Sequence, residues 1–479
     1  MKIPKSNAFC LPIFIIMICA ITSCSSGGDG NTGTADPTDP ASPADPPADG
    51  GEEVGEVAPT DCTILQSQVL SPTLQTEVPN GIQADLCDFN VMGWESFLYL
   101  VEPVSEGSNE RRFEDTEAYP NYLGKEADSC AGQSNSDLLT LFTSATDPSA
   151  SKEAGTGTEV YSVGPEGSSE GDIVRYNVRF SQNLCGNTAS TLPDNLVEIK
   201  SAWRVIGSGT NASDYYTIDV TLKSGDQLEL GLIGFHLAQT TPLHPEMIWT
   251  SWEHVDNAPD CVPSGSSPAR PANGWTMMTN SCAACISSDI TSPDCTSECK
   301  NPEKTSATPI NINIGRCAEN PSSALTCQPP TGAPPDIPAM AEPTNICRVF
   351  PEGTQDGDNQ SAQNRANIRA LNEQIIGEDG YLTNLDPSDP QAVWRNYQMV
   401  GGIWFNSDGT PDPTQQRGSI QLANSVMETT FQGSFTPGTG GTMGSSGGKN
   451  CFGCHNSSSF PASQSGFLSH ISPYINGPN

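Results

Sequence analysis

Residues 228–237, Leu-Glu-Leu-Gly-Leu-Ile-Gly-Phe-His-Leu, are the strongest indication of the fold class in this sequence. It begins with alternating apolar and polar residues, as in a strand with one buried face, and then becomes apolar on both faces. Segments at 174–180, 197–205 and 216–222 follow the same period of two, with Gly, Asn and Ser between them. Several such strands predict an antiparallel β-rich, sandwich-like body in a protein of the α+β class.

Helical patterns flank this body. Residues 85–101 (DLCDFNVMGWESFLYLV) place apolar side chains at nearly helical intervals and predict a buried helix. The helical period returns late in the chain and predicts helices over 361–376, 391–400 and 420–432; a short helix is also expected over 137–143. The sequence therefore predicts a β-rich body with an N-terminal helix at 61–260 and a helical segment at 351–479.

The N-terminus carries the pattern of an export signal. Two lysines precede an apolar run at 8–21, which has the length of a signal-peptide core and is short for a membrane-spanning helix. The run ends in Ile21-Thr22-Ser23-Cys24, which resembles a bacterial lipobox, so we expect removal of residues 1–23 and a lipid on Cys24. The serine after Cys24 favours the outer membrane. The alternative is an ordinary signal peptide that leaves Cys24 as a free thiol.

Composition indicates which partners suit the chain. Its 479 residues carry a formal net charge of −35, which opposes binding to nucleic acid and would attract basic electron carriers. The alternative explanation of this charge is an environment that favours acidic proteins. Residues 24–60 consist mainly of Gly, Pro, Asp, Thr and Ala and cannot bury enough apolar surface to fold. We expect this segment to be a disordered tether to the membrane, with a reach of roughly 30–35 Å.

The 17 cysteines divide into groups. Two leave with the signal peptide, one is the lipidation site and two belong to the motif described next, so an even number remains. In an oxidising compartment the remaining cysteines predict disulfides. Many of them lie in 261–350, among Pro, Ser and Thr, and this zone predicts a loop-rich insertion stapled by disulfides. A four-thiolate metal site within 282–299 is the competing interpretation.

The motif Cys451-Phe452-Gly453-Cys454-His455 carries a chemical mechanism. Two thiols at this spacing, followed at once by an imidazole, form the attachment pattern of c-type haem. Cys451 and Cys454 would each bond to one vinyl group of the porphyrin, and His455 would ligate the iron. The alternative is a local disulfide, or half of another metal site, beside a bystander histidine.

The iron of such a haem has a second axial position. No methionine follows Met443, so a methionine located after the motif cannot fill this position. The candidates are Met427, Met443, His254 and His470; water or an open position would also be possible. Met427 is preferred because its predicted helix could hold it rigidly, although ordinary core packing is its alternative role. His254 could instead serve a second metal site or a hydrogen-bonded core.

Several phrases together resemble a group of bacterial exported proteins described as cytochrome c family proteins, which carry one CxxCH near the C-terminus. The phrases are WESFLYL (94–100), EIKSAWRV (198–205), GFHLAQTT (234–241), WTSWEHVDN (249–257), LANSVMETTFQ (422–432) and CFGCHN (451–456). The resemblance implies haem at Cys451, Cys454 and His455. It implies no substrate and no catalytic residue.

These observations predict a membrane-anchored c-type cytochrome with one covalent haem c, which transfers electrons in the periplasm or at the outer membrane. Its expected associations are the membrane, through the lipid anchor, and a redox partner protein. A haem enzyme with an open axial site, of peroxidase or oxidase type, is one alternative, and a non-haem disulfide-rich surface lipoprotein is another. The sequence contains no H-E-x-x-H, phosphate-binding glycine loop or dinucleotide fingerprint.

Overall fold

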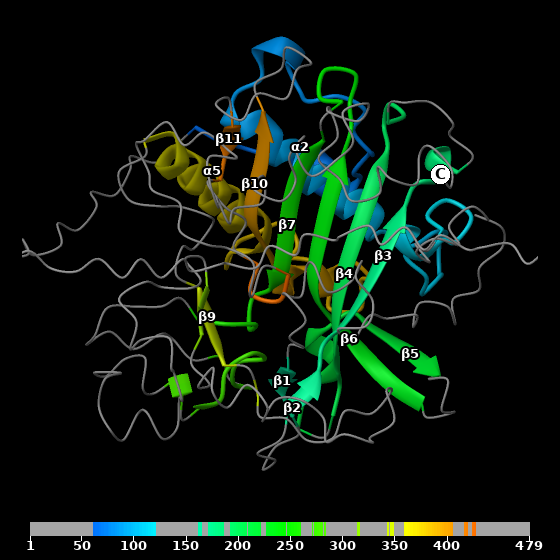
Figure 1. Cartoon of the computed structure of the whole chain (residues 1–479), viewed down its shortest axis with the longest axis vertical. Coiled ribbons are helices and arrows are strands. Elements are labelled where there is room, and N and C mark those ends of the chain that lie inside the picture. The colour runs from blue at the N-terminus through cyan, green and yellow to red at the C-terminus, as the bar shows by residue number, and fades with distance from the viewer. Residues whose placement is uncertain are drawn as a thin grey trace, which may run out of the picture. The chain divides into compact units, whose positions relative to one another are not determined.

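In the computed structural model, the main element of the protein is one large antiparallel sheet (Figure 1). The residues that the structure describes are 61–120, 161–164, 171–185, 192–207, 209–221, 227–245, 247–259, 271, 273–280, 282–283, 314–316, 343, 345–348, 359–405, 416–419 and 424–427. Within these ranges no helix combines the length and the apolar character needed to cross a membrane.

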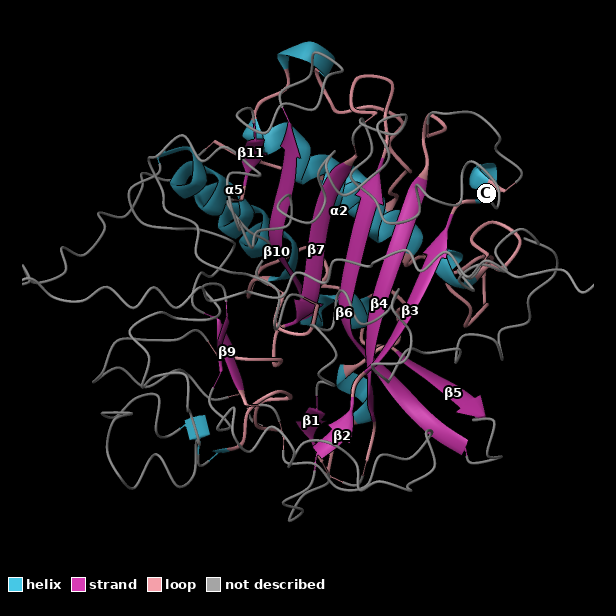
Figure 2. Cartoon of the chain, in the orientation of Figure 1, coloured by secondary structure: helices cyan, strands magenta, loops and turns pink. Residues whose placement is uncertain are grey.

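Seven strands form the main sheet in the order β11-β10-β7-β6-β4-β3, with β5 paired to the first part of β6 (Figure 2). The strands are β3 (Arg175–Phe180), β4 (Val197–Val205), β5 (Thr217–Thr221), β6 (Gln227–Gln239), β7 (Ile248–His254), β10 (Tyr397–Phe405) and β11 (Gln416–Gly418). Every pairing is antiparallel. The predicted antiparallel, β-rich α+β class is therefore confirmed.

The remaining described elements are short, apart from two helices. They are α1 (Gln66–Leu70), α2 (Leu86–Leu100), α5 (Asn359–Ile376), the strand pairs β1 (Tyr161–Val163) with β2 (Gly171–Ile173) and β8 (Ile314–Arg316) with β9 (Ile346–Arg348), and the 3-10 turns η1 (Gly81–Gln83), η2 (Arg112–Glu114), η5 (Gln182–Leu184), η6 (Ala212–Asp214) and η10 (Ala392–Asn396). The predicted helices at 85–101 and 361–376 correspond to α2 and α5, and both predictions are confirmed.

Strand β6 lies in the interior of the sheet and contains the stretch 228–237. It pairs with β4 on one side and β7 on the other, so that Leu237 lies opposite both Ile199 and Thr250. All of its residues after Glu229 are buried. Because both faces of the strand are covered, its second half needs apolar residues at successive positions, and this requirement explains why the alternation in the sequence stops there.

Helix α2 begins at a complete capping box. The side chain of Asp85 accepts hydrogen bonds from the N–H groups of Cys87 and Asp88, and the carboxylate of Asp88 accepts one from the N–H of Asp85. These bonds satisfy N–H groups that the first turn of a helix leaves without intrahelical partners. The N-terminal end of α2 is therefore specified locally.

The body of α2 lies against the sheet. Trp94, Phe97 and Leu98 on this helix are fully buried. Gly93 allows the close approach, because a Cβ atom at this position would lie 2.8 Å from Cγ2 of Thr250 on β7. A glycine in a helix interior is unfavourable by about 1 kcal/mol relative to alanine, so its presence here is explained by the contact.

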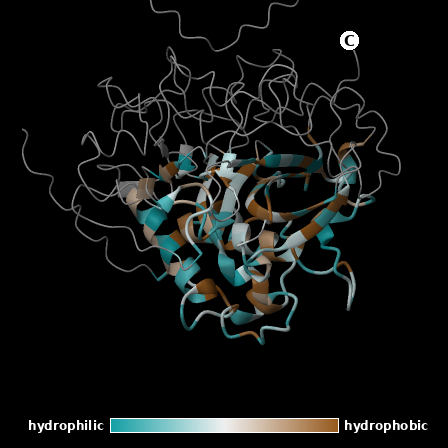
Figure 3. Ribbon diagram, turned by 90° about the horizontal axis from the view of Figure 1, so that it is seen from below, coloured by the Kyte–Doolittle hydropathy of each residue, from teal (hydrophilic) through white to brown (hydrophobic). Residues whose placement is uncertain are grey.

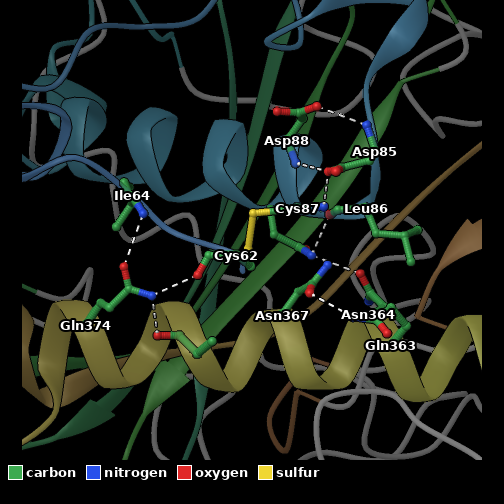
Figure 4. The surroundings of a disulfide bond; sticks show 12 residues. Cys62, Ile64, Asp85, Leu86, Cys87, Asp88, Gln363, Asn364, Asn367 and Gln374 are labelled. Atoms are coloured by element: carbon green, nitrogen blue, oxygen red, sulfur yellow. Dashed lines mark hydrogen bonds between the residues drawn. A yellow bond between two sulfur atoms is a disulfide. The ribbon is translucent and has the colours of Figure 1, made fainter. Parts of the chain in front are cut away.

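Helix α5 packs beside α2 on the same face, and its polar side chains hold neighbouring segments (Figure 4). The amide of Gln374 donates to the carbonyl oxygen of Cys62 and accepts from the N–H of Ile64. The amide of Asn364 accepts a hydrogen bond of 2.8 Å from Nδ2 of Asn90 in the buried interface. The disulfide between Cys62 and Cys87 ties the same N-terminal segment to α2.

Aromatic rings fill the space between the helices and the sheet. Phe97 stacks on Trp252 of β7 with 4.6 Å between ring centroids, and it meets Phe235 and Trp394 edge-on at 5.2 and 5.7 Å. Figure 3 shows brown hydrophobic positions interspersed with teal hydrophilic ones along the described ribbon. This cluster is the main hydrophobic core.

A second cluster lies on the opposite face of the sheet, which we call the second face. Its buried apolar members are Val174, Tyr176, Ala202, Tyr215, Ile233, Ala258, Met277, Ile346, Val426 and Met427. Six of them lie on β3, β4, β6 and β9 or in the turn at 424–427, and the other four, Val174, Tyr215, Ala258 and Met277, lie in connecting segments. In the described part of the chain the large sheet is thus covered by two helices on one face and by short segments on the other, rather than by a second large sheet as in a sandwich.

The predicted helix over 391–400 is wrong. Residues Ala392–Asn396 form the 3-10 turn η10, and Tyr397–Phe405 form β10, which pairs with the edge of β7. The segment is apolar at adjacent positions, a pattern that fits a buried strand as well as a helix. The strand is selected over the helix because it supplies backbone hydrogen bonds to the edge of β7 that β6 does not cover. Part of the 351–479 segment is therefore in the same sheet as the 61–260 body.

Several predictions concern residues that are not described. They are the signal peptide at 1–23, Cys24 and the tether, the short helix at 137–143, most of the insertion at 261–350, and the segment from 428 to 479 with its CxxCH. Of the predicted helix at 420–432, only residues 424–427 are described, and they form a turn. Cys185, Cys282 and Cys347 are disulfide-bonded, and the state of Cys282 argues against a four-thiolate metal site within 282–299.

Candidate functional site

The residues predicted to hold haem, Cys451, Cys454 and His455, lie outside the described part of the chain, as do the other possible ligands Met443 and His470. The described residues nearest to the motif in sequence are the turn at 424–427. The structure therefore informs on two of the predicted site residues, Met427 and His254, and on how the chain approaches the motif.

Met427 closes the turn and is almost completely buried, with a relative exposure of 2%. Its side chain belongs to the apolar cluster of the second face. Its N–H donates to Oδ1 of Asn424, at 3.2 Å, as does the N–H of Val426 at 3.1 Å. A thioether packed in this way fills space in the core, which is the alternative role that the sequence left open for Met427.

Asn424 anchors the turn to β7. Its Nδ2 donates to Oγ of Ser251 at 2.9 Å and to the carbonyl oxygen of Trp252 at 2.7 Å. Since Oδ1 of the same side chain accepts from the turn itself, a single amide connects the turn to the strand. The hydroxyl of Tyr176 adds a hydrogen bond of 2.8 Å to the carbonyl oxygen of Val426.

Glu253 on β7 lies at the centre of this junction and is completely buried. One carboxylate oxygen, Oε1, accepts from the guanidinium of Arg348 on β9. The other, Oε2, accepts from both the N–H and the hydroxyl of Ser425, each at 2.6 Å. One carboxylate thus joins three segments that are far apart in the sequence: the strand β7, the end of the cysteine-rich insertion, and the turn that leads towards the CxxCH.

Two opposing effects act on the ionisation of Glu253. Burial raises the pKa of its carboxyl group above the ordinary value, while the charge of Arg348 and the hydrogen bonds from Ser425 act to lower that pKa. All of the hydrogen bonds described above are donated to the carboxyl group, which is the arrangement that an ionised carboxylate requires. The junction is therefore specific for a carboxylate at position 253.

His254 follows Glu253 and is the last residue of β7. The N–H of Asp256 donates to Nδ1 of His254 at 3.2 Å, so Nδ1 is the acceptor and the ring proton lies on Nε2. Nε2 is 2.9 Å from the carbonyl oxygen of Asp214, to which it donates. Both ring nitrogens are therefore engaged within the protein, and neither is directed at a metal position in this arrangement.

The surroundings of His254 keep its ring neutral. The imidazole is stacked on Tyr215 and meets Tyr397 edge-on, at centroid distances of 4.2 and 5.3 Å. Burial is the main reason that its pKa is lowered to about 4, and the nearby charge of Arg204 lowers it further. These observations fit the hydrogen-bonded core role for His254. Among the described residues, no group of three or more His, Cys, Asp or Glu side chains could hold a metal ion.

A second buried charged cluster surrounds Glu114 in the turn η2. The phenol of Tyr216 donates to the carboxylate of Glu114, which also accepts from the N–H of Arg111 at 2.8 Å. The guanidinium of Arg179 donates to the carbonyl oxygens of Glu114 and Tyr119, each at 3.0 Å. The contacts are mostly with backbone and ring atoms, as expected for a cluster that stabilises the fold.

In the sequence, Glu253 is only one position of the phrase WTSWEHVDN, and the sequence-based predictions of site residues include none of Arg348, Asn424 and Ser425. The sequence predicts a helix for LANSVMETTFQ, whereas its described residues 424–427 form a turn. The one available signal was the pair of polar residues, Asn424 and Ser425, between apolar positions, because Asn and Ser side chains readily bind turns of the backbone.

No protein-family model, no curated protein and no solved structure matches the chain.

Proposed function

We propose that this protein is an exported c-type haem protein that is anchored to the membrane by a lipid on Cys24, and that it transfers electrons outside the cytoplasm. The observation that carries the proposal is the motif Cys451-Phe452-Gly453-Cys454-His455. Two thiols and an imidazole are the donor set that covalent haem requires, with Cys451 and Cys454 as the attachment points and His455 as the iron ligand. Haem held in this way would supply reversible one-electron chemistry.

The disulfide between Cys62 and Cys87 supports the compartment in this proposal. Stable disulfides are typical of proteins outside the cytoplasm, where c-type haem is also attached. The signal-like N-terminus points to the same location by an independent route. Two features at opposite ends of the chain and one in its body thus favour the same compartment.

The body would serve as a rigid support in this proposal. In the described structure Met427 packs in the apolar cluster, and both nitrogens of His254 bond within the protein. The second axial ligand stays a prediction, with Met427, Met443, His254, His470, water or an open position as the candidates. The net charge of −35 favours a basic protein as redox partner.

The test is the absorption spectrum, oxidised and reduced, of the chain from Ser25 onward, produced in a host that attaches c-type haem. Haem that stays on the denatured, reduced chain, with sharp low-spin bands, is the expected result. The variant Cys451→Ser/Cys454→Ser should lose covalent haem. The variant Cys282→Ser/Cys285→Ser is the matched control, because it removes the other CxxC pair, which no histidine follows, and should keep the haem.

Other outcomes would assign the protein differently. Retained haem with high-spin bands that shift on addition of carbon monoxide would identify a haem enzyme with an open axial site. A colourless product from a host that matures a control cytochrome would contradict both haem proposals. The protein would then be a disulfide-rich surface lipoprotein without haem.

A further inference from the structure

We propose that Glu253 is a positioning residue, which fixes the start of the CxxCH-bearing segment on the second face of the sheet. The contact itself is independent of haem. Only its consequence, the placement of the haem group relative to the body, rests on the proposed function.

The chemistry of the contact is specific. Each oxygen of Glu253 accepts hydrogen bonds, Oε1 from Arg348 and Oε2 from two donors of Ser425. A carboxamide at this position would have one oxygen and one NH₂ group, and the NH₂ group would meet a donor on one side or the other. Glutamine therefore has almost the same shape as Glu253 but cannot make the same set of bonds.

The turn at 424–427 packs closely enough on the sheet for Ser425 to reach Glu253. Gly234 on β6 provides the space, because a Cβ atom there would lie 2.6 Å from Cγ2 of Val426 and 3.3 Å from Oδ1 of Asn424. Val426 itself is fully buried. The turn thus lies directly on the backbone of β6 while Glu253 binds it from β7. Strand β6 and strand β7 together form a seat for residues 424–427.

The seat is the last described attachment of the chain before the motif. Cys451 follows Met427 by 24 positions. If the turn detaches, the preceding described attachment is Ser419, whose N–H donates to the carbonyl oxygen of Gly402, and Cys451 follows it by 32 positions. A longer connection allows the attached group to occupy a larger volume. Glu253 therefore restricts where the motif can lie relative to the sheet.

The same carboxylate links the turn to the cysteine-rich insertion. Arg348 follows Cys347, which is disulfide-bonded, and its strand β9 contributes Ile346 to the apolar cluster that also contains Met427. Because a buried charge needs its partners, loss of either Arg348 or Ser425 weakens the binding of the other through Glu253. The insertion and the C-terminal segment are thereby energetically coupled.

The experiment compares Glu253→Gln with the parent protein by hydrogen–deuterium exchange of the amides at 424–427, together with the haem spectrum and midpoint potential of the same samples. Loss of hydrogen bonds to a charged acceptor should accelerate exchange of the Ser425 amide by about tenfold or more. Glu114→Gln is the matched control, because Glu114 is also a buried carboxylate but makes its contacts with Arg111 and Tyr216. Ser425→Ala removes one donor, leaves the pair with Arg348 in place and should give a smaller acceleration.

Faster exchange in Glu253→Gln but not in Glu114→Gln, with a changed haem spectrum or potential, would support the proposal. Equal exchange in the two variants would overturn it. Faster exchange with an unaltered spectrum and potential would show that the contact holds the turn without positioning the haem, and would overturn that part. If the parent carries no haem but the exchange difference is present, the proposed function fails while the anchoring contact stands. If Glu253→Gln does not fold, Ser425→Ala decides the question by the same readouts.

Discussion

The imidazole of His254 stacks on the phenol ring of Tyr215, with 4.2 Å between ring centroids and 15° between ring planes. Its Nε2 donates to the backbone at Asp214, in the turn η6 that immediately precedes Tyr215. A protonated ring would have to lose the acceptor role of Nδ1 towards the N–H of Asp256. The pair therefore requires a neutral histidine, and this requirement has a measurable dependence on pH.

The first prediction is that His254 makes the protein less stable in mild acid. The pKa of His254 is about 4 in the folded protein and 6.5 in its ordinary environment. As the pH falls from about 6.5 to about 4, the unfolded chain gains a proton that the folded state does not accept, and stability decreases by up to about 3 kcal/mol. Urea denaturation as a function of pH should show this decrease. His254→Gln should remove it, and an unchanged pH profile in that variant would contradict the prediction.

The second prediction is that Asp256 acts in the opposite direction over nearly the same range. Burial, and then the charge of Asp214, raise the pKa of Asp256 from 3.8 to about 6. The folded state therefore holds this proton more strongly, and its stabilising contribution is lost as the pH rises through about 6. In Asp256→Asn the decrease in stability between pH 6.5 and pH 4 should be steeper than in the parent. The same denaturation series in this variant and in His254→Gln would separate the two contributions.

The third prediction concerns the aromatic core. Phe97 is fully buried and contacts Trp252, Phe235 and Trp394. Phe97→Ala should lower the free energy of unfolding by about 3–5 kcal/mol because it leaves a cavity, and Phe97→Leu should lower it less. Ile82→Ala is the control, since this side chain is 77% exposed and its loss should change stability by less than about 0.5 kcal/mol. Equal effects at the two positions would show that Phe97 does not pack as described.

The fourth prediction concerns the disulfide between Cys62 and Cys87, which closes a loop with a sequence separation of 25. Replacing both cysteines with alanine should lower the free energy of unfolding by about 3 kcal/mol, mainly by releasing the unfolded chain. The capping box at Asp85 remains in the variant, so helix α2 should persist in circular dichroism at low denaturant. A variant as stable as the oxidised parent would contradict this contribution of the disulfide.

The fifth prediction tests the approach of α2 to the sheet. Gly93→Ala places a methyl group 2.8 Å from Cγ2 of Thr250 and should destabilise the protein by about 1–3 kcal/mol. Thr250→Ser removes the opposing methyl group. The double variant should therefore recover part of the loss, so that the two effects on the free energy of unfolding are not additive. Simple additivity would show that the two side chains do not meet.

Strand β10 could not be predicted from the sequence alone. The adjacent apolar residues within 391–400 fit a helix or a strand, and only the pairing of β10 with β7 selects the strand. By contrast, α2 could be predicted to within a residue, because its capping box and its apolar periodicity are both local properties. The apolar segment of β6 was assigned correctly for a similar reason, since turn residues bound it and its first half alternates.

The candidate site divides in the same way. A covalent motif such as Cys451-Phe452-Gly453-Cys454-His455 is readable because its chemistry depends on adjacent residues. The junction at Glu253 was not readable, because Arg348 is 95 positions away and Ser425 is 172 positions away in the chain. Nothing in the local pattern of Glu253 distinguishes a carboxylate in a buried junction from one in solvent.

The sequence by itself determined the β-rich α+β class, the helices α2 and α5, and the proposal of a covalent haem, because periodicity, caps and CxxCH spacing are properties of neighbouring residues. The tertiary structure decided that 397–405 is a strand, that the turn at 424–427 lies on β6 and β7, and that both nitrogens of His254 are engaged. These outcomes depend on which distant segments come together when apolar surface is buried. Burial then favours a hydrogen-bond partner for each buried polar group, and that partner can lie anywhere in the chain.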